Sequence, residues 1–236
     1  MNNIRNSQYD AQTLSICDCG LADYRSVLQQ QLQLWEQRRQ NKIPDTILIV
    51  EHPPVITLGA RLNANKLLVV PEQLLQKGID IVNIRRGGGA TAHNPGQLVF
   101  YPILNLQHLG LGINEYIREL ETIGIELLKQ LCVCSTRRKG YPGLWIGNNS
   151  QSKIVNRQFK KVASIGVRVS KGVTYHGMAI NIQNDLSIFD LIVPCGLDGI
   201  EMTSVLKETG NEQSMADVKN KLKILLCEHL GKTEDR

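Results

Sequence analysis

The stretch that spans residues 161–182 reads KVASIGVRVSKGVTYHGMAINI. Two runs rich in β-branched residues, 161–169 and 173–182, flank the short polar sequence Ser170-Lys171-Gly172. This pattern predicts two antiparallel strands joined by a hairpin turn. Because strands that pair through hairpins build antiparallel sheets, this stretch decides the fold class.

The rest of the chain divides into further strands and amphipathic helices. Apolar residues recur at helical spacing in some segments, and short apolar runs mark the strands. We expect a single α+β domain over residues 1–236, with a mixed, largely antiparallel sheet flanked by helices and with ends that fray at about 1–12 and 231–236. The expected helices are 23–40, 71–76, 114–132 (with Asn114 as the N-cap) and 215–230; the expected strands are 46–50, 55–58, 79–84, 98–106 and 140–147, with a loop at 148–156.

The overall charge and composition narrow the possible partners. The formal net charge is +5 and the sequence pI is about 8.9, a mild excess that favours acidic partners. With only 3 phenylalanines and 2 tryptophans, a base-stacking surface is not expected, and we predict no nucleic-acid partner. The N-terminus lacks the apolar core of a signal peptide, and no apolar run is long enough to cross a membrane. We therefore expect a cytoplasmic protein without membrane association.

The 6 cysteines are expected to be reduced thiols in that compartment. Two pairs, Cys17 with Cys19 and Cys132 with Cys134, have C-x-C spacing. Structural zinc sites use wider gaps and usually add histidines, so we expect no metal. Cys132 and Cys134 lie in an apolar segment, which predicts core or strand positions.

A glycine-rich segment precedes one of the expected strands. Residues 85–101 read RRGGGATAHNPGQLVFY. Three consecutive glycines lack the Cβ atoms that would keep a ligand away from the main chain, so the segment predicts a binding surface. It matches neither common nucleotide loop, because no Gly-Lys-Ser/Thr follows and there is no G-x-G-x-x-G pattern.

Cys195 stands between Pro194 and Gly196 in an expected loop. From the residues alone it is either a structural cysteine or a nucleophile. A nucleophilic cysteine needs a cation or base near its thiolate. The candidates for that partner are Lys161, His93, His176 and Lys171.

Two adjacent lysines, Lys160 and Lys161, begin the first strand of the hairpin. Side chains alternate between the two faces of a strand, so one lysine is expected to point inward. An inward lysine must find an anionic or hydrogen-bonding partner.

Four sequence blocks, in this order, resemble the lipoyl(octanoyl) transferases of lipoate biosynthesis. They read EHPPVITLG, RGGGATAHNPGQLVFYPILNL, KVASIGVRVSKGVTYHGMAINI and IVPCG, and MTSV follows. The resemblance covers roughly residues 46–206 and implies the fold of the biotin and lipoate protein ligases, without a cofactor. It implies transfer of an octanoyl group from acyl carrier protein to a lysine of lipoyl-carrier domains. Those acceptors are the lipoyl domains of 2-oxoacid dehydrogenases and the glycine cleavage H protein.

The resemblance also assigns roles to individual residues. Cys195 forms the thioester, and Lys161 stabilises its thiolate or acts as the base. The acyl chain is bound by the glycine-rich segment and by two short pieces of the hairpin: Arg86, Gly87, Gly88, Gly89, Ala90, Thr91, Ala92, His93, Ser164, Ile165, Gly166, Gly177, Met178 and Ala179.

Two positions depart from the family pattern. Asn94 stands where glycine is usual, and asparagine tolerates left-handed backbone better than most residues. Ala92 stands where an aromatic residue is common, which predicts a wider pocket.

Several alternatives stay open in the sequence. Val167, Met178 and Ile180 either line an alkyl tunnel or belong to the core. Backbone N–H groups near Gly196 or the Thr91 hydroxyl are expected to stabilise an oxyanion. An ATP-dependent ligase on the same fold would not need Cys195, and a catalytically silent carrier-binding protein is a third reading.

Overall fold

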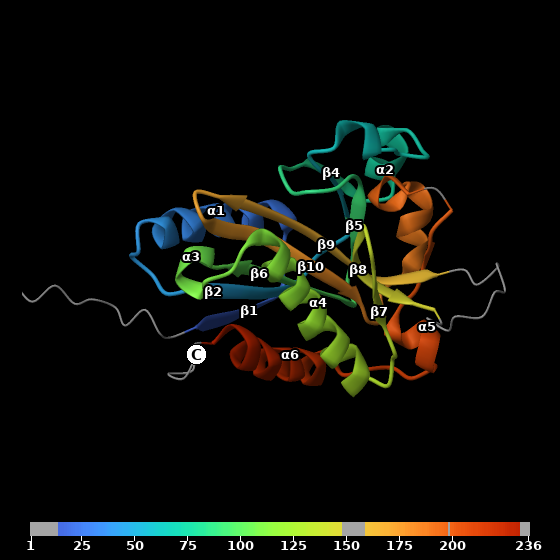
Figure 1. Cartoon of the computed structure of the whole chain (residues 1–236). Helices are drawn as coiled ribbons and strands as arrows, with labels where there is room; N and C mark the ends of the chain where they lie inside the picture. The colour runs from blue at the N-terminus through green and yellow to red at the C-terminus, as the bar shows by residue number, and fades with distance from the viewer. Residues whose placement is uncertain (1–13, 148–158, 198, 232–236) are drawn as a thin grey trace, which may run out of the picture.

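The computed structural model of the protein describes residues 14–147, 159–197 and 199–231. An eight-stranded sheet forms its centre (Figure 1), in the order β1-β2-β6-β10-β9-β8-β7, with β11 beside β9. Parallel pairing joins β1 to β2 and β11 to β9, and the other neighbours are antiparallel. This confirms the mixed, largely antiparallel sheet. The strands are Ser15–Leu21 (β1), Thr46–Glu51 (β2), Gln97–Ile103 (β6), Thr136–Arg138 (β7), Tyr141–Ile146 (β8), Lys160–Ser170 (β9), Val173–Asn181 (β10) and Glu201–Met202 (β11).

Helices cover both faces of this sheet. The helix α1 (Tyr24–Arg39) packs on one face, and α4 (Ile113–Gln130) and α6 (Met215–Leu230) pack on the other (Figure 1). Successive side chains of β2 point to opposite faces of the sheet. Leu48 packs with α1, whereas Ile47 and Ile49 belong to the core beneath α4 and α6. The sheet therefore separates two apolar cores.

A second sheet of three strands adjoins the first. It has the order β4-β3-β5 and contains Asp80–Asn83 (β4), Val55–Leu58 (β3) and Thr91–His93 (β5). The helix α2 (Pro71–Gln76) and the 3-10 helix η2 (Leu186–Leu191) complete its core, which includes Ile56, Leu74 and Phe189. Because β5 leads directly into β6, the glycine-rich segment is held where the two sheets meet. The remaining helical segments are Leu62–Ala64 (η1), Leu106–Leu109 (α3), Pro194–Gly196 (η3) and Val205–Thr209 (α5).

The hairpin prediction is confirmed, and so is the inward lysine. Residues of β9 and β10 pair from Ser170 with Val173 to Ala163 with Ile180. Lys161 is 2% exposed, while Lys160 on the other side of the strand donates to Glu208 at 3.3 Å. The hairpin also places Gly166 opposite Gly177, so this point of the sheet has no side chains.

Other sequence expectations need correction. The helix α4 begins after Gly112, so Asn114 lies inside it and is not the N-cap. The strand expected to reach residue 106 ends at Ile103, because Asn105 caps α3 through its side chain. The sequence did not reveal β1 or β7, which are the first and last strands in the order of the large sheet. The loop expected at 148–156 lies outside the described residues.

Cys132 and Cys134 are exposed, contrary to the expected core positions. They follow the last turn of α4, where Cys132 adopts a left-handed φ of 60°. The apolar side chains of this segment that do reach the core are Leu131 and Val133.

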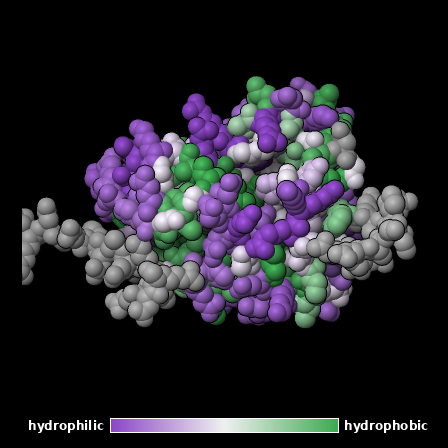
Figure 2. Space-filling view, in the orientation of Figure 1, coloured by the Kyte–Doolittle hydropathy of each residue, from purple (hydrophilic) through white to green (hydrophobic). Residues whose placement is uncertain are grey.

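Hydrophilic side chains cover the outer sides of two of the packed helices (Figure 2). Figure 2 shows hydrophilic residues over the outer sides of α1 and α6, whose apolar sides face the sheet. Among the helices in the described ranges, none combines the length and the apolar character that crossing a bilayer requires.

Candidate active site

Cys195 lies in η3 at a sharp turn of the backbone. Its φ of 59° and ψ of 11° are left-handed, which is unusual for a residue with a Cβ. The Cys195 N–H donates to the carbonyl oxygen of Ala90 at 2.8 Å, which ties η3 to the start of β5. Next to it, a Cβ on Gly196 would lie 2.5 Å from the Cβ of Ala64. The segment between β3 and β4 and the segment between β4 and β5 therefore fix the half-buried thiol in place.

The ammonium group of Lys161 lies within hydrogen-bonding distance of this thiol. The distance from Lys161 Nζ to Cys195 Sγ is 3.3 Å. Nζ also donates to the carbonyl oxygen of Pro142 at 3.2 Å and lies 5.0 Å from the centre of the Trp145 ring. Within the described residues, no carboxylate pairs with Nζ. Nζ is therefore placed to pair with a negative charge on Sγ.

The carbonyl group of Pro142 is presented by an irregular point in β8. Gly143 has a φ of 117°, and a Cβ there would lie 2.3 Å from the carbonyl oxygen of Ala163. Its N–H donates to the buried carboxylate of Glu121 at 3.2 Å, and that carboxylate pairs with Arg137 at 3.1 Å. Only glycine fits this approach, so the α4 carboxylate and the glycine together aim the Pro142 carbonyl at Lys161.

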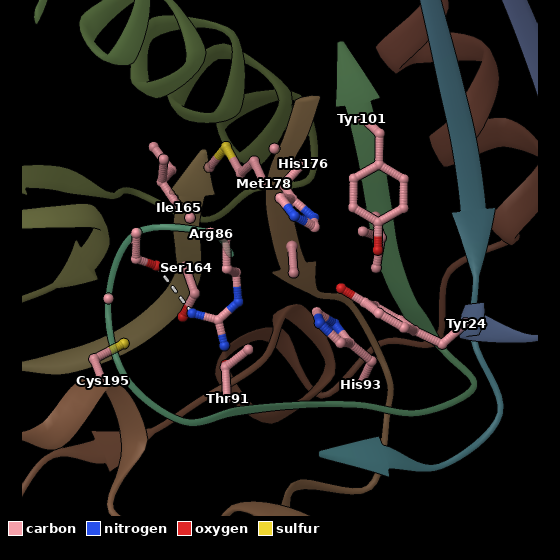
Figure 3. A pocket seen from close by; sticks show the side chains of 16 residues that line it. Tyr24, Arg86, Thr91, His93, Tyr101, Ser164, Ile165, His176, Met178 and Cys195 are labelled. Carbon is pink, nitrogen blue, oxygen red and sulfur yellow. Dashed lines mark hydrogen bonds between the residues drawn. The ribbon is translucent and has the colours of Figure 1, made fainter. Parts of the chain in front are cut away.

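A pocket extends inward from the thiol (Figure 3), with Cys195 at one end and Tyr24 and Tyr101 at the other. The space between its walls, with the open end of the pocket included, is about 440 Å³. Most residues that the sequence assigned to acyl binding lie in the wall: Arg86, Gly87, Gly88, Thr91, His93, Ser164, Ile165, Gly166, Gly177, Met178 and Ala179.

Three assigned residues of the glycine-rich segment do not line the pocket. Gly89 packs on Ala64, whose carbonyl oxygen would lie 2.2 Å from an added Cβ. Ala90 and Ala92 are buried in the core of the small sheet. The alternation of β5 explains this, because Thr91 and His93 face the pocket and Ala92 faces away. The expected widening of the pocket by Ala92 is therefore wrong.

The other departure, Asn94, also has a different role from the one expected. Its backbone is not left-handed; the positive φ of 85° falls on Gly96. The Asn94 side chain donates to the carbonyl oxygen of Asp185 at 2.7 Å and accepts from Asn184 at 3.0 Å. Asn94 thus ties the turn before β6 to the segment that leads to η2.

Two further expectations are settled by packing and hydrogen bonds. Met178 lines the pocket and also belongs to the core beneath α4, whereas Val167 and Ile180 pack with that core without lining the pocket. The N–H of Gly196 donates to the carbonyl oxygen of Val193 at 3.1 Å, so it is not free to stabilise an oxyanion. The Thr91 hydroxyl remains in the pocket wall.

Only one of the four proposed partners of the thiol is a suitable cation. Burial lowers the pKa of both His93 and His176 to about 3, so both are neutral at pH 7. Lys171 lies in the hairpin turn, about 33 Å along β9 from Lys161 at the usual rise of a strand. Lys161 alone among them reaches Cys195.

The sequence analysis missed most of the inner end of the pocket. Tyr24, Val99 and Tyr101 come from α1 and β6 and line this end. Behind them, His52 Nε2 lies 2.8 Å from the Tyr101 hydroxyl and His52 Nδ1 lies 2.8 Å from the Ala22 carbonyl oxygen. Burial lowers the pKa of His52 to about 4. We call Tyr24, His52, His93, Tyr101 and His176 the inner cluster; at neutral pH it is polar but uncharged.

Arg86 crosses the pocket between the thiol and the inner cluster (Figure 3). Its guanidinium group donates to the Gly87 carbonyl at 3.0 Å and to both oxygens of Thr57 at 2.9 and 2.8 Å. Burial lowers its pKa, and Nε has no partner among the described atoms. This buried cation without a carboxylate suits a ligand that carries or develops negative charge.

Comparisons with known proteins place this geometry among acyl-transferring and ligating enzymes. The model of the lipoyl protein ligase A/B catalytic domain matches residues 23–225. An octanoyltransferase of Roseiflexus sp. (strain RS-1) is 41% identical over 216 residues, which cover 91% of this chain and 86% of that protein. An octanoyltransferase of Chloroflexus aggregans is 38% identical, covering 91% and 94%.

Solved structures share the fold at low sequence identity. The bipartite lipoate protein ligase of Thermoplasma acidophilum has a TM-score of 0.67 at 14% identity, covering 93% of this chain and 84% of that one. A lipoate-protein ligase A bound with ATP has a TM-score of 0.61 at 17% identity, covering 93% and 85%.

Proposed function

Since the chain belongs to the octanoyltransferases, within the family of lipoyl protein ligase A/B catalytic domains, we propose that it transfers an octanoyl group from octanoyl-acyl carrier protein to a lysine of lipoyl-carrier domains. The acceptors would include the lipoyl domains of 2-oxoacid dehydrogenases and the glycine cleavage H protein. The observation that carries the proposal is the 3.3 Å contact of Lys161 Nζ with Cys195 Sγ at one end of the pocket.

In the first half-reaction the Cys195 thiolate attacks the carbonyl carbon of the donor thioester. A bond forms between Sγ and that carbon, the oxyanion collapses, and the bond to the donor sulfur breaks. The Lys161 ammonium is placed to give its proton to the departing thiolate. The Thr91 hydroxyl and the Arg86 guanidinium group, both in the pocket wall, are candidates to stabilise the oxyanion.

The second half-reaction reverses these roles. The acceptor amine attacks the Cys195 thioester, the new N–C bond forms, and Sγ leaves as a thiolate. Lys161, neutral after the first step, takes the proton that the amine loses. The side-chain-free pair Gly166 and Gly177 offers a smooth wall for the alkyl chain throughout.

Intact-mass spectrometry tests the proposal. We expect the wild-type protein to gain the mass of one octanoyl group when it meets octanoyl-acyl carrier protein without an acceptor and without ATP. Cys195→Ala should gain nothing, and adding a lipoyl domain should remove the adduct from the wild type. The proposal is wrong if no adduct forms and octanoylation of the lipoyl domain requires free octanoate and ATP.

A further inference from the structure

A chain of hydrogen bonds fixes the orientation of the Gln97 amide behind the pocket wall. Gln97 Nε2 donates to the Ala92 carbonyl oxygen at 3.2 Å and to Asn181 Oδ1 at 2.9 Å. Asn181 Nδ2 donates to the Thr203 carbonyl oxygen at 2.9 Å, which fixes the Asn181 amide as well. Because backbone carbonyl oxygens can only accept, the side-chain oxygen of Gln97 must act as an acceptor on the other side of its amide.

This orientation decides which nitrogen of His93 carries the proton. His93 Nδ1 lies 2.7 Å from the side-chain oxygen of Gln97, so Nδ1 is the donor. The ring is neutral at pH 7, which leaves Nε2 as a hydrogen-bond acceptor. Nε2 has no partner among the described atoms, and His93 lines the pocket. The inner end of the pocket therefore presents an unused acceptor.

A second histidine in the wall at this end, His176, has no hydrogen-bond partner on its ring within the described part of the chain. Its backbone is left-handed, with a φ of 57°, and its N–H donates to the buried side chain of Gln31 at 2.9 Å. Residues held in such backbone conformations are common at ligand sites. A neutral imidazole has one N–H and one lone pair, so the His176 ring can donate as well as accept. We call His93 and His176 the histidine pair.

The neighbouring Tyr101 hydroxyl does not supply a donor for the histidine pair. His52 Nδ1 must donate to the Ala22 carbonyl oxygen, so His52 Nε2 accepts the proton of the Tyr101 hydroxyl. That proton is therefore not available to His93. A donor for His93 Nε2 has to come from whatever fills the pocket.

An eight-carbon acyl chain on Cys195 is long enough to reach the histidine pair. The Cys195 N–H donates to the carbonyl oxygen of Ala90, and His93 lies three residues farther along the chain, roughly 10 Å away at the usual rise of a strand. An extended chain covers about 1.2 Å per bond, so the seven carbon–carbon bonds of an octanoyl group span roughly 8 Å. Figure 3 shows Cys195 at one end of the pocket and His93 at the other. The carbon farthest from the thioester therefore arrives beside His93.

We propose that the histidine pair binds a hydroxyl at the far end of the acyl chain, so that ω-hydroxyacyl groups are substrates as well as octanoyl. This inference rests on the proposed function, because the chain is carried by the same Cys195 thioester. A hydroxyl can donate to His93 Nε2 and accept from His176, and it thereby satisfies both rings. The methyl end of an octanoyl group makes neither hydrogen bond.

Two small thioesters that differ only at the far end of the chain test this proposal. Cys195 is loaded from the N-acetylcysteamine thioesters of ω-hydroxyoctanoate and ω-fluorooctanoate, and intact-mass spectrometry follows the adduct. Fluorine is close in size to a hydroxyl but has no proton to donate, so the ratio of the two loading rates isolates the hydrogen bonds from the shape of the pocket. The variants are His93→Phe and His176→Phe; the second keeps the test open if Gln97, left without its partner, prevents His93→Phe from folding. The matched control is Val99→Ala, which changes an apolar residue in the wall of the same end.

We expect the wild type at low thioester concentration to load the ω-hydroxy chain about 5- to 20-fold faster than the ω-fluoro chain, the effect of one or two hydrogen bonds. His93→Phe should bring this ratio to one or below, because the buried hydroxyl loses its acceptor. His176→Phe should lower the ratio by about 2- to 5-fold. Val99→Ala should keep the ratio of the wild type.

Other outcomes overturn the inference. A wild-type ratio near one would show that the histidine pair binds no hydroxyl, and so would a high ratio that persists in folded His93→Phe. An equal fall of the ratio in Val99→Ala would assign the preference to the shape of the pocket. Failure of the wild type to load from octanoyl thioesters as well would contradict the proposed function, and this inference with it.

Discussion

The two ends of the pocket bury polar groups to a similar degree but hold them in different charge states. At the end of the pocket that holds Cys195, which we call the mouth, Lys161 Nζ contacts three groups. They are the Pro142 carbonyl oxygen, the Trp145 ring and the Cys195 thiol. In the inner cluster, burial keeps His52, His93 and His176 neutral.

The difference teaches what burial alone can and cannot do. A histidine titrates near neutral pH, so modest desolvation suffices to remove its charge, whereas a lysine needs far more. The end of the pocket that holds Cys195 therefore places an amine beside the thiol, while the inner end offers hydrogen bonds without charge. Substitutions at the mouth should change rates, and perturbations of the inner cluster should change stability.

The largest expected effect follows from Lys161→Met. Removing the ammonium takes away both the support for the thiolate and the proton donor, so loading of Cys195 should slow by about 10²- to 10⁴-fold. Single-turnover loading from an octanoyl thioester measures this. Alkylation of the thiol at pH 7 should also slow.

Lys160→Met is the matched control, because Lys160 pairs with Glu208 on the other side of the same strand. It should leave loading within about twofold of the wild type, because Lys160 and its half-buried ion pair lie on the other face of the strand from the thiol. Equal losses in the two variants would mean that Lys161 acts only through the fold.

The second-largest expected effect is a loss of folding stability at low pH that originates in the inner cluster. Its histidines have folded-state pKa values of about 4 for His52 and about 3 for His93 and His176, below the ordinary value. Below about pH 6.5 the unfolded chain binds protons that the folded protein excludes, so stability falls as the pH falls. The loss should be roughly 3 kcal/mol between pH 7 and 5.5, a window above the titration of most carboxylates.

Urea unfolding at a series of pH values measures this dependence. His229 provides the opposite case within the same chain: burial alone would lower its pKa, but hydrogen bonds to Glu126 and Glu119 outweigh burial and raise it. The stabilisation of the folded state by protonated His229 is present at low pH and is lost as the pH rises through the folded-state pKa of His229. His229→Gln should therefore steepen the loss in acid, and a flat profile in the wild type would refute the neutral inner cluster.

The smallest expected effect is that of His52→Leu. The change leaves the Ala22 carbonyl oxygen and the Tyr101 hydroxyl without their 2.8 Å partners, which should cost about 1–3 kcal/mol of stability. Loading of Cys195 should change by less than about threefold, well below the effect of a lost general acid–base group, because His52 stands behind the pocket wall.

His108→Leu is the control for this substitution, since exposed His108 also holds one side-chain partner, Arg38, at 2.9 Å. Its effect on unfolding should stay within about 0.5 kcal/mol. A loading defect in His52→Leu as large as that of Lys161→Met would contradict the prediction that the inner cluster affects stability and not the loading rate.

The sequence predicted the parts of this molecule that depend on local periodicity. The hairpin of β9 and β10, the helix α1 and the inward Lys161 all follow from spacings of two or 3.6 residues. The placing of Ala92 in the pocket was an avoidable error, because alternation along β5 separates it from Thr91 and His93.

Other features depend on packing between distant segments and left no local signal. Tyr24 begins a helix far from the glycine-rich segment in sequence, and nothing around it marks a pocket residue. Tyr101 reads as an ordinary strand residue until His52 and Tyr24 surround it. The sequence resemblance implied the roles of Cys195 and Lys161, but only the three-dimensional arrangement shows that Pro142 and Trp145 lie against Lys161.

At the left-handed position of Cys195, the residue that the proposed reaction needs is less favourable for stability than glycine. A residue with a Cβ in this conformation costs about 1–2 kcal/mol relative to glycine. A random change of Cys195 to glycine would abolish thioester formation and at the same time relax the turn. In any lineage that acquires its lipoyl groups by another route, drift should therefore convert this position to glycine readily, and the more stable descendant would keep the pocket without the chemistry.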